Sequence, residues 1–201
     1  MIKSFLQFIN ENHDDNDGHD DRSELADLES LYSLGMVDDA QYCSDAIRIL
    51  KSMGVISSSE PIVSINIDSS FEGVEERETK VLSDLVRDWT GPYGERILEL
   101  TMNLDDNDDG ETRLLLDTGI DCTFIHSPSG DWWGTSAEIS VADRIFTEHD
   151  ILDNYVYDEE EDEEDTPFYP NYADQFESML RPICKMYGKM AVDSILKKLK
   201  P

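Results

Sequence analysis

The amino-acid sequence predicts an α+β protein with an N-terminal helical pair, an antiparallel sheet of about four or five strands and a C-terminal helix. Apolar residues recur at helical spacing between residues 23 and 54 and again between residues 172 and 199. Between these two regions, apolar and polar residues alternate with the period of a strand. Short polar turns separate the later strands, and short turns favour antiparallel pairing.

The helical pair has recognisable ends. Ser23 is the expected N-cap of the first helix, and Gly35 suits its end because glycine adopts the left-handed conformation at little cost. Asp38 or Asp39 is the expected N-cap of the second helix, which ends at Gly54. The expected apolar faces comprise Leu25, Leu28, Leu31, Tyr32 and Leu34 in the first helix and Tyr42, Cys43, Ala46, Ile47, Ile49 and Leu50 in the second.

The central part of the sequence is expected to form several strands and one helix. Residues 62–67 alternate as a strand does, and residues 75–89 carry a helical apolar face. Residues 90–94 form a Gly- and Pro-containing turn. The remaining expected strands are residues 96–104, 112–117, 121–126 and 136–141.

The C-terminal part combines an acidic run with a long helix. Residues 158–165 are all acidic, and such a run is expected to be exposed because it repels itself. The last helix is expected over residues 172–199, where Pro182 should kink or split it. The predicted organisation is a short amphipathic helix within residues 1–11, an acidic linker at 12–22 and a single domain at 23–201.

The charge of the chain restricts its partners. Among 201 residues, 46 are Asp or Glu and 16 are Lys or Arg, which gives a formal net charge of −30. Phosphate backbones and anionic membranes bind cationic surfaces, so no direct nucleic-acid or membrane partner is expected. A basic protein surface is the expected partner. The three cysteines show no CxxC spacing, which favours a reduced cytosolic compartment.

The sequence offers little catalytic chemistry. Asp105, Asn107 and Asp109 share the spacing of a calcium loop, but Leu116 stands where such a loop has its bidentate glutamate. A solvated hairpin turn is therefore expected there, with no metal. Cys122 and His126 share one face of an expected strand, the basis of an alternative as a hydrolase or transferase. The expectation is a protein that is not an enzyme and needs no cofactor.

Two segments are candidates for partner binding. Trp132 and Trp133 are adjacent, so in a strand one of them faces outward and can anchor an interface. The second candidate is the acidic run, which consists of Asp158, Glu159, Glu160, Glu161, Asp162, Glu163, Glu164 and Asp165.

The first eleven residues form the most specific pattern. Lys3, Phe5, Phe8 and Ile9 belong to a short amphipathic helix that ends in Ile9-Asn10-Glu11. This segment resembles the capsid-targeting sequences of internal head proteins of T-even-type tailed bacteriophages. Those sequences begin with Met-Lys-Ser/Thr-aromatic and end in Ile/Leu-x-Glu, where the prohead protease cuts. Ile2 is an additional residue before the lysine.

The resemblance covers residues 1–11 alone, which we call the tag, and it implies a route of delivery. It implies that the phage scaffold and the prohead protease act on residues 1–11, that cleavage follows Glu11, and that the protein passes from the virion interior to the host cytoplasm. Internal proteins of this kind can antagonise host defence enzymes. The expected function is thus binding and inhibition of a host protein. The alternative is a cytosolic acidic adaptor or a DNA mimic that inhibits a nucleic-acid-binding enzyme.

Overall fold

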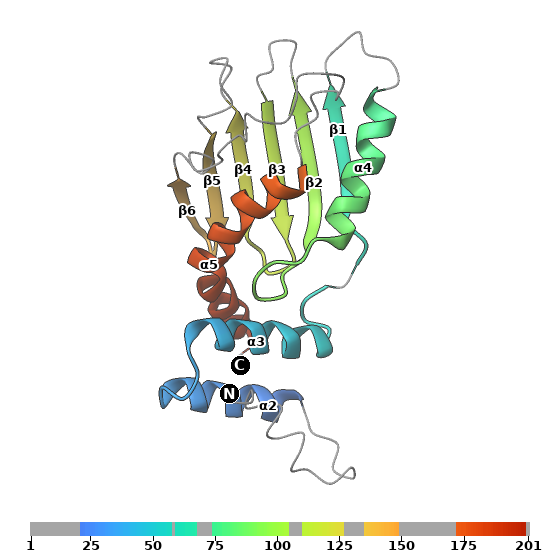
Figure 1. The fold of residues 1–201 in the computed structure, drawn as a ribbon. Coiled ribbons are helices and arrows are strands. Elements are labelled where there is room, and N and C mark those ends of the chain that lie inside the picture. The colour runs from blue at the N-terminus through green and yellow to red at the C-terminus, as the bar shows by residue number, and fades with distance from the viewer. Residues whose placement is uncertain are drawn as a thin grey trace, which may run out of the picture.

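The protein is an α+β structure in which a six-stranded sheet is flanked by helices (Figure 1). The computed structural model describes residues 21–57, 59–67, 74–104, 110–126, 135–148 and 172–199. Its elements are α2 (Asp21–Ser33), α3 (Asp39–Ser52), β1 (Ile62–Ile67), α4 (Val74–Asp88), β2 (Ile97–Leu104), β3 (Gly110–Leu116), β4 (Asp121–His126), β5 (Thr135–Val141), β6 (Arg144–Glu148) and α5 (Tyr172–Leu199).

The strands lie in the sheet in their order along the chain, β1 to β6. The fold class predicted from the sequence is confirmed, but the predicted strand number and the wholly antiparallel arrangement are wrong. β1 pairs with β2 in parallel, and the other neighbours are antiparallel. The parallel pair is possible because α4 supplies the long crossover that parallel strands require. β6 was missed because three of its five residues are polar and the strand is too short to show a clear alternation of apolar and polar residues.

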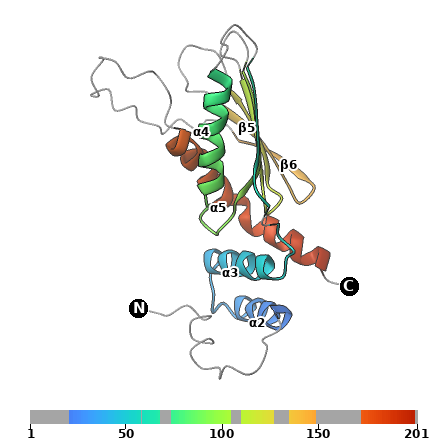
Figure 2. The ribbon, with the colours of Figure 1, turned by 90° about the vertical axis from the view of Figure 1, so that its right-hand side faces the viewer.

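α4 and α5 cover the same face of the sheet (Figure 2). The residues between this face and the two helices form the larger core, in which Leu100, Leu114, Phe124, Ile139 and Leu180 are completely buried. No described element covers the opposite face. The sheet is therefore one layer of a two-layer structure, as expected for α+β proteins.

A second core joins the helical pair to the C-terminal half of α5. Its members include Leu28 from α2, Ile47 and Leu50 from α3, and Val192 and Leu196 from α5. The Tyr32 and Tyr42 rings stack with centroids 4.3 Å apart, and Lys189 Nζ of α5 lies 5.0 Å from the Tyr32 centroid. Because α5 also contributes to the larger core, it connects the two parts of the fold.

The ends of the paired helices follow local rules. Asp38 is the N-cap of α3, and its Oδ1 accepts a hydrogen bond of 2.8 Å from Gln41 N. Gly35 has a φ of +69° beyond the end of α2, which confirms the expected glycine stop. The prediction for the start of α2 was wrong, since the helix begins at Asp21 and includes Ser23. Leu34, expected on the apolar face, is 73% exposed because it lies beyond that end.

The long C-terminal helix has the predicted bounds. Pro182 lies inside α5 without dividing it into two elements, although proline removes one helical donor. Its core-facing side includes Ile183, Cys184 and Tyr187, all buried, whereas Met186 is 60% exposed.

A strained turn joins the last two strands. Val141 pairs with Arg144, so Ala142 and Asp143 form a two-residue turn. Both have positive φ, 51° and 60°, which a type I′ turn requires at its two central positions. Glycine and asparagine suit this conformation, whereas the Cβ atom of most residues makes it unfavourable.

Replacing the exposed turn residue should stabilise the protein. Asp143→Gly removes the Cβ atom at a positive φ and should raise the free energy of unfolding by about 0.5–1 kcal/mol. Denaturant unfolding measures the change. Glu138→Gly, in the middle of β5, is the control and should lower the free energy of unfolding by a similar amount. A destabilised Asp143→Gly variant would contradict this account of the turn.

Candidate functional site

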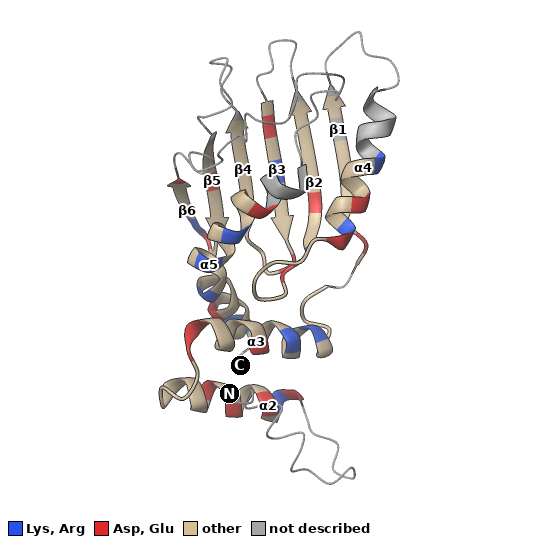
Figure 3. Cartoon of the chain, in the orientation of Figure 1, with Lys and Arg blue, Asp and Glu red and all other residues tan. Residues whose placement is uncertain are grey.

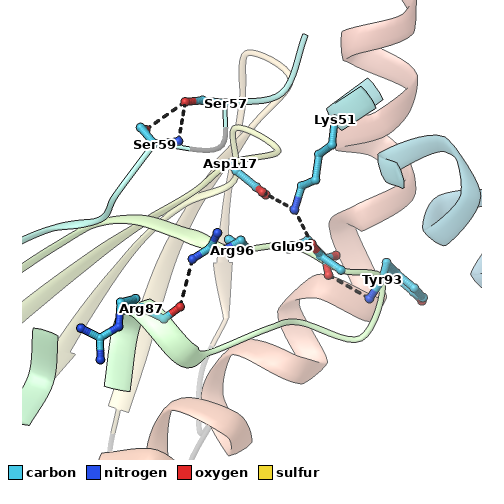
Figure 4. Close-up of polar contacts among 9 residues, drawn as sticks. Lys51, Ser57, Ser59, Arg87, Tyr93, Glu95, Arg96 and Asp117 are labelled. Atoms are coloured by element: carbon cyan, nitrogen blue, oxygen red, sulfur yellow. Dashed lines mark hydrogen bonds and ion pairs between the residues drawn. The ribbon is translucent and has the colours of Figure 1, made fainter. Parts of the chain in front are cut away.

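Buried charged side chains meet where the helical pair joins the sheet (Figure 4). Lys51 comes from the last turn of α3, Glu95 from the loop before β2, and Asp117 from the turn after β3. The Glu95 residue is 0% exposed and the Asp117 residue is 8% exposed. We call Lys51, Glu95 and Asp117 the junction cluster. Such burial of carboxylates is rare unless they are paired.

Lys51 holds the cluster together. Its Nζ lies 2.7 Å from Asp117 Oδ2 and donates a hydrogen bond of 2.5 Å to the Gly94 carbonyl oxygen. The ammonium is thus within ion-pair distance of the buried Asp117 carboxylate. Lys51 thereby joins α3 to the β2 and β3 ends of the sheet.

The loop before β2 is built around Glu95. Its Oε2 accepts a hydrogen bond of 2.9 Å from Tyr93 N, whereas Oε1 has no hydrogen-bond partner among the described residues. Two glycines make room for this side chain. A Cβ at Gly91 would lie 2.5 Å from Glu95 Oε2, and a Cβ at Gly188 would lie 3.0 Å from the Tyr93 ring. Gly188 thus allows the loop to approach α5 closely.

Burial changes the pKa values of the acidic side chains in and beside the junction cluster. Burial raises the pKa of the Glu95 carboxyl, although hydrogen bonds from backbone amides oppose the rise. Burial also raises the pKa of the Asp117 carboxyl, and its contact with Lys51 opposes that rise. The pKa of the Cys184 thiol is raised by burial and by the neighbouring Glu95 carboxylate. The ionised form of each group is therefore disfavoured here.

Two cavities flank the junction. One, of about 190 Å³, lies between the β3–β4 turn, the β5–β6 turn and α5, and we call it the junction cavity. It is lined by Val55, Ile56, Asp117, Thr118, Gly119, Ala142, Ala191, Ser194, Ile195 and Lys198. The other, of about 390 Å³, lies between α3 and α5 and includes Cys43, Tyr93 and Lys189.

The open face of the sheet has a polar, hydrogen-bonded middle row and also carries the exposed apolar side chains of Ile62, Ile125 and Ile145. Its middle row crosses all six strands as Ser64, Thr101, Arg113, Thr123, Glu138 and Thr147. Arg113 makes two hydrogen bonds to the Asp121 carboxylate, of 3.0 and 2.6 Å. Ser64 and Thr101 hydroxyls lie 3.1 Å apart. The polar middle row is compatible with contact with water.

The surroundings of the cysteines disfavour the alternative of a hydrolase or transferase with a nucleophilic cysteine. Cys122 is 0% exposed on the covered face of β4, and burial raises the pKa of its thiol to about 12. A nucleophilic cysteine requires the thiolate, which this environment disfavours. His126 ends β4, and its side chain lies outside the described residues. Cys43 is also buried, and burial raises the pKa of its thiol to about 12.

The other sequence candidates lie outside the described residues. These are the targeting helix with Lys3, Phe5, Phe8, Ile9, Asn10 and Glu11, the loop with Asp105, Asn107 and Asp109, the Trp132–Trp133 pair and the acidic run 158–165. Within the described ranges, no group of three metal-ligating side chains gathers. No described helix is long and apolar enough to cross a membrane.

No protein-family model matches the chain, and neither the curated proteins nor the solved structures provide a match. The junction cluster must therefore be interpreted from its own geometry. Sequence analysis missed it because Glu95 and Asp117 resemble any other acids in so acidic a chain. Gly91 and Gly188 mark the place where the chain segments approach closely, but only the fold shows what they surround.

Breaking the buried ion pair should destabilise the protein strongly. Lys51→Met leaves the Asp117 carboxylate buried without its cation and should lower the free energy of unfolding by about 3 kcal/mol. Adding Asp117→Asn should recover part of the loss, because no charge is then buried. Arg113→Met, which breaks an exposed ion pair with Asp121, is the control and should cost less than about 1 kcal/mol. Equal losses would contradict the importance of the junction cluster.

Neutralising Glu95 should change how stability depends on pH. The unfolded chain loses the Glu95 proton near the ordinary pKa of 4.5, whereas the folded protein retains it to higher pH. Between these two pKa values the folded state binds more protons, so the contribution of Glu95 to stability falls as pH rises. Glu95→Gln removes this contribution.

The stability of the Glu95→Gln variant relative to the wild type should therefore increase from acidic pH toward neutrality. Denaturant unfolding of both proteins across this range measures the difference, and effects of the overall charge largely cancel. A difference that is constant with pH would contradict the raised pKa of Glu95.

Proposed function

We propose that the chain is an internal protein of a T-even-type phage, packaged in the head, cleaved after Glu11 and delivered with the genome to inhibit a host protein. The observation that carries the proposal is the N-terminal segment, in which Lys3-Ser4-Phe5 precedes Phe8-Ile9 and Ile9-Asn10-Glu11. The segment and the rest of the chain have separate roles in this proposal: the first supplies delivery and the second supplies the activity.

The position of the cleavage site supports a separable tag. The described residues that form the two hydrophobic cores all follow the expected cut. Leu28 and Leu50 of the second core lie well beyond the cut. A mature protein that begins at Asn12 would retain every described residue of both cores.

The charge supports a protein target rather than DNA. The removed peptide carries Lys3 and Glu11 and has no formal net charge from its side chains, so the mature chain keeps the formal net charge of −30. Such a protein avoids the packaged DNA, because like charges repel. A host protein with a basic surface is instead attracted, and electrostatic attraction increases the association rate.

The arrangement of the acids bears on the alternative of a DNA mimic. Mimicry requires carboxylates spaced along a face as phosphates are along a strand. The described acids occur on the helices, the strands and the connecting loops, with neutral residues between them (Figure 3). On the open face, Glu99, Glu111 and Glu138 belong to different cross-strand rows. This distribution gives mimicry no specific support, so our proposal names a basic protein surface only.

The N-terminus of the protein in purified virions tests the proposal. Mass spectrometry should find the chain beginning at Asn12. Glu11→Ala, which removes the acidic residue of the cleavage motif, should leave a full-length chain in the particle. A Glu99→Ala variant, which alters the second Ile-x-Glu sequence within β2, should still be processed to begin at Asn12. Absence from virions, or a full-length wild-type chain in mature particles, would refute packaging and processing.

A further inference from the structure

The outer edge of β6 carries backbone groups that no described strand pairs with. β6 is the last strand of the sheet, and β5 is its neighbour on the inner side (Figure 1). Val141 and Arg144 close the two-residue turn, so the N–H and C=O groups of Arg144 point toward β5. Because this direction alternates along a strand, the same groups of Ile145 and Thr147 point outward. These two residues can therefore form backbone hydrogen bonds with a further strand.

The side chains of β6 leave apolar surface at this edge. Ile145 lies on the open face of the sheet and is 68% exposed, and Thr147 on the same face is also exposed. Phe146 points to the opposite face, where its ring centroid lies 4.8 Å from that of Tyr187, and it is only partly buried. A further strand would cover the exposed part of these side chains.

The two ends of β6 carry opposite charges. Arg144 is exposed, its guanidinium carbon lies 5.5 Å from the centroid of the Phe146 ring, and it has no ion pair with another described residue. Glu148, at the other end, accepts a hydrogen bond of 2.5 Å from the Tyr187 hydroxyl group through Oε1. A carboxylate has two oxygens, so Oε2 can accept a further hydrogen bond from a cationic group.

The sequence of β6 is complementary to itself when two copies run antiparallel. If Phe146 lies opposite Phe146 of a second copy, Ile145 lies opposite Thr147 and Arg144 lies opposite Glu148. In this register the outward-pointing residues of one copy meet those of the other, as hydrogen-bonded antiparallel pairs require. Opposite charges directly across two strands stabilise their pairing, whereas like charges destabilise it. A two-fold axis at Phe146 makes each of these contacts occur twice.

We propose that two copies of this chain associate through their β6 edges into one continuous antiparallel sheet, with Arg144 of each copy paired with Glu148 of the other. β1, at the other edge of the sheet, has no charged residue and lacks this complementarity. One five-residue strand forms a small interface, so a dissociation constant in the high micromolar range is expected. The net charge of −30 opposes association, but salt screens this repulsion beyond about 8 Å at physiological ionic strength.

Sedimentation equilibrium and amide hydrogen exchange test the dimer and locate its interface. The full chain should show a reversible monomer–dimer equilibrium at physiological ionic strength. Protection of the Ile145 and Thr147 amides should rise with protein concentration, because their N–H groups are bonded only in the dimer. The Phe146 amide points toward β5 and should be protected at every concentration.

Charge reversal separates the proposed ion pairs from an effect of net charge. Arg144→Glu and Glu148→Arg each place like charges opposite one another, and each should weaken dimerisation about tenfold. An equimolar mixture of the two variants should restore dimers, because every pair again has opposite charges. The double variant Arg144→Glu/Glu148→Arg keeps the net charge of the wild type and should dimerise as the wild type does.

Two further variants complete the comparison. Glu111→Arg, on β3, changes the net charge as Glu148→Arg does and should not weaken dimerisation. Ile145→Lys should weaken it, because a charged side chain at a sheet edge opposes pairing. Ile145 is exposed, so this variant should fold even if Glu148→Arg does not because it loses the contact with Tyr187.

A chain that stays monomeric at millimolar concentration would overturn the proposal. So would a dimer that Arg144→Glu and Ile145→Lys leave unchanged, since its interface must then lie elsewhere. Slow exchange of the Ile145 and Thr147 amides in dilute protein would also overturn it, because another part of the chain then already pairs with this edge. Tighter association of Glu148→Arg, or no association in the mixture, would exclude the ion pairs. The dimer needs neither the tag nor a host protein, so these results are independent of the function proposed above.

Discussion

The two parts of the fold depend on one helix that packs against both. The first half of α5 covers the sheet through residues such as Leu180 and Ile183, and the second half contacts the helical pair through Val192 and Leu196. A helix can serve two cores only where its apolar side continues along its length. Gly188 lies between these halves and admits the Tyr93–Glu95 loop, which fills the corner between the two cores. The position of the junction cluster follows from this packing.

Burial of carboxylates at that corner is expected to lower the free energy of unfolding. Glu95 and Asp117 are removed from water, and the ammonium of Lys51 reaches one of them directly. Replacing such groups by well-packed apolar residues is often neutral or stabilising in proteins.

Delivery and activity belong to different parts of the chain in the proposed function. The tag requires only a short amphipathic helix and an accessible bond after Glu11. The rest of the chain requires a surface that avoids DNA and attracts a basic partner, and its excess of acidic residues meets both conditions. The open face of the sheet contributes acids such as Glu111 and Glu138 to that surface.

The sequence by itself determined the local elements and the charge. The helical period of α3, its Asp38 cap, the Gly35 stop and the bounds of α5 depend on neighbouring residues, and these expectations agree with the structure. The parallel pairing of β1 and β2, the edge strand β6 and the meeting of Lys51 with Asp117 were decided by tertiary structure. Each joins residues distant along the chain or depends on a neighbouring strand. A pattern within one segment cannot specify which distant acid becomes buried beside which lysine, because burial is a property of the packed fold.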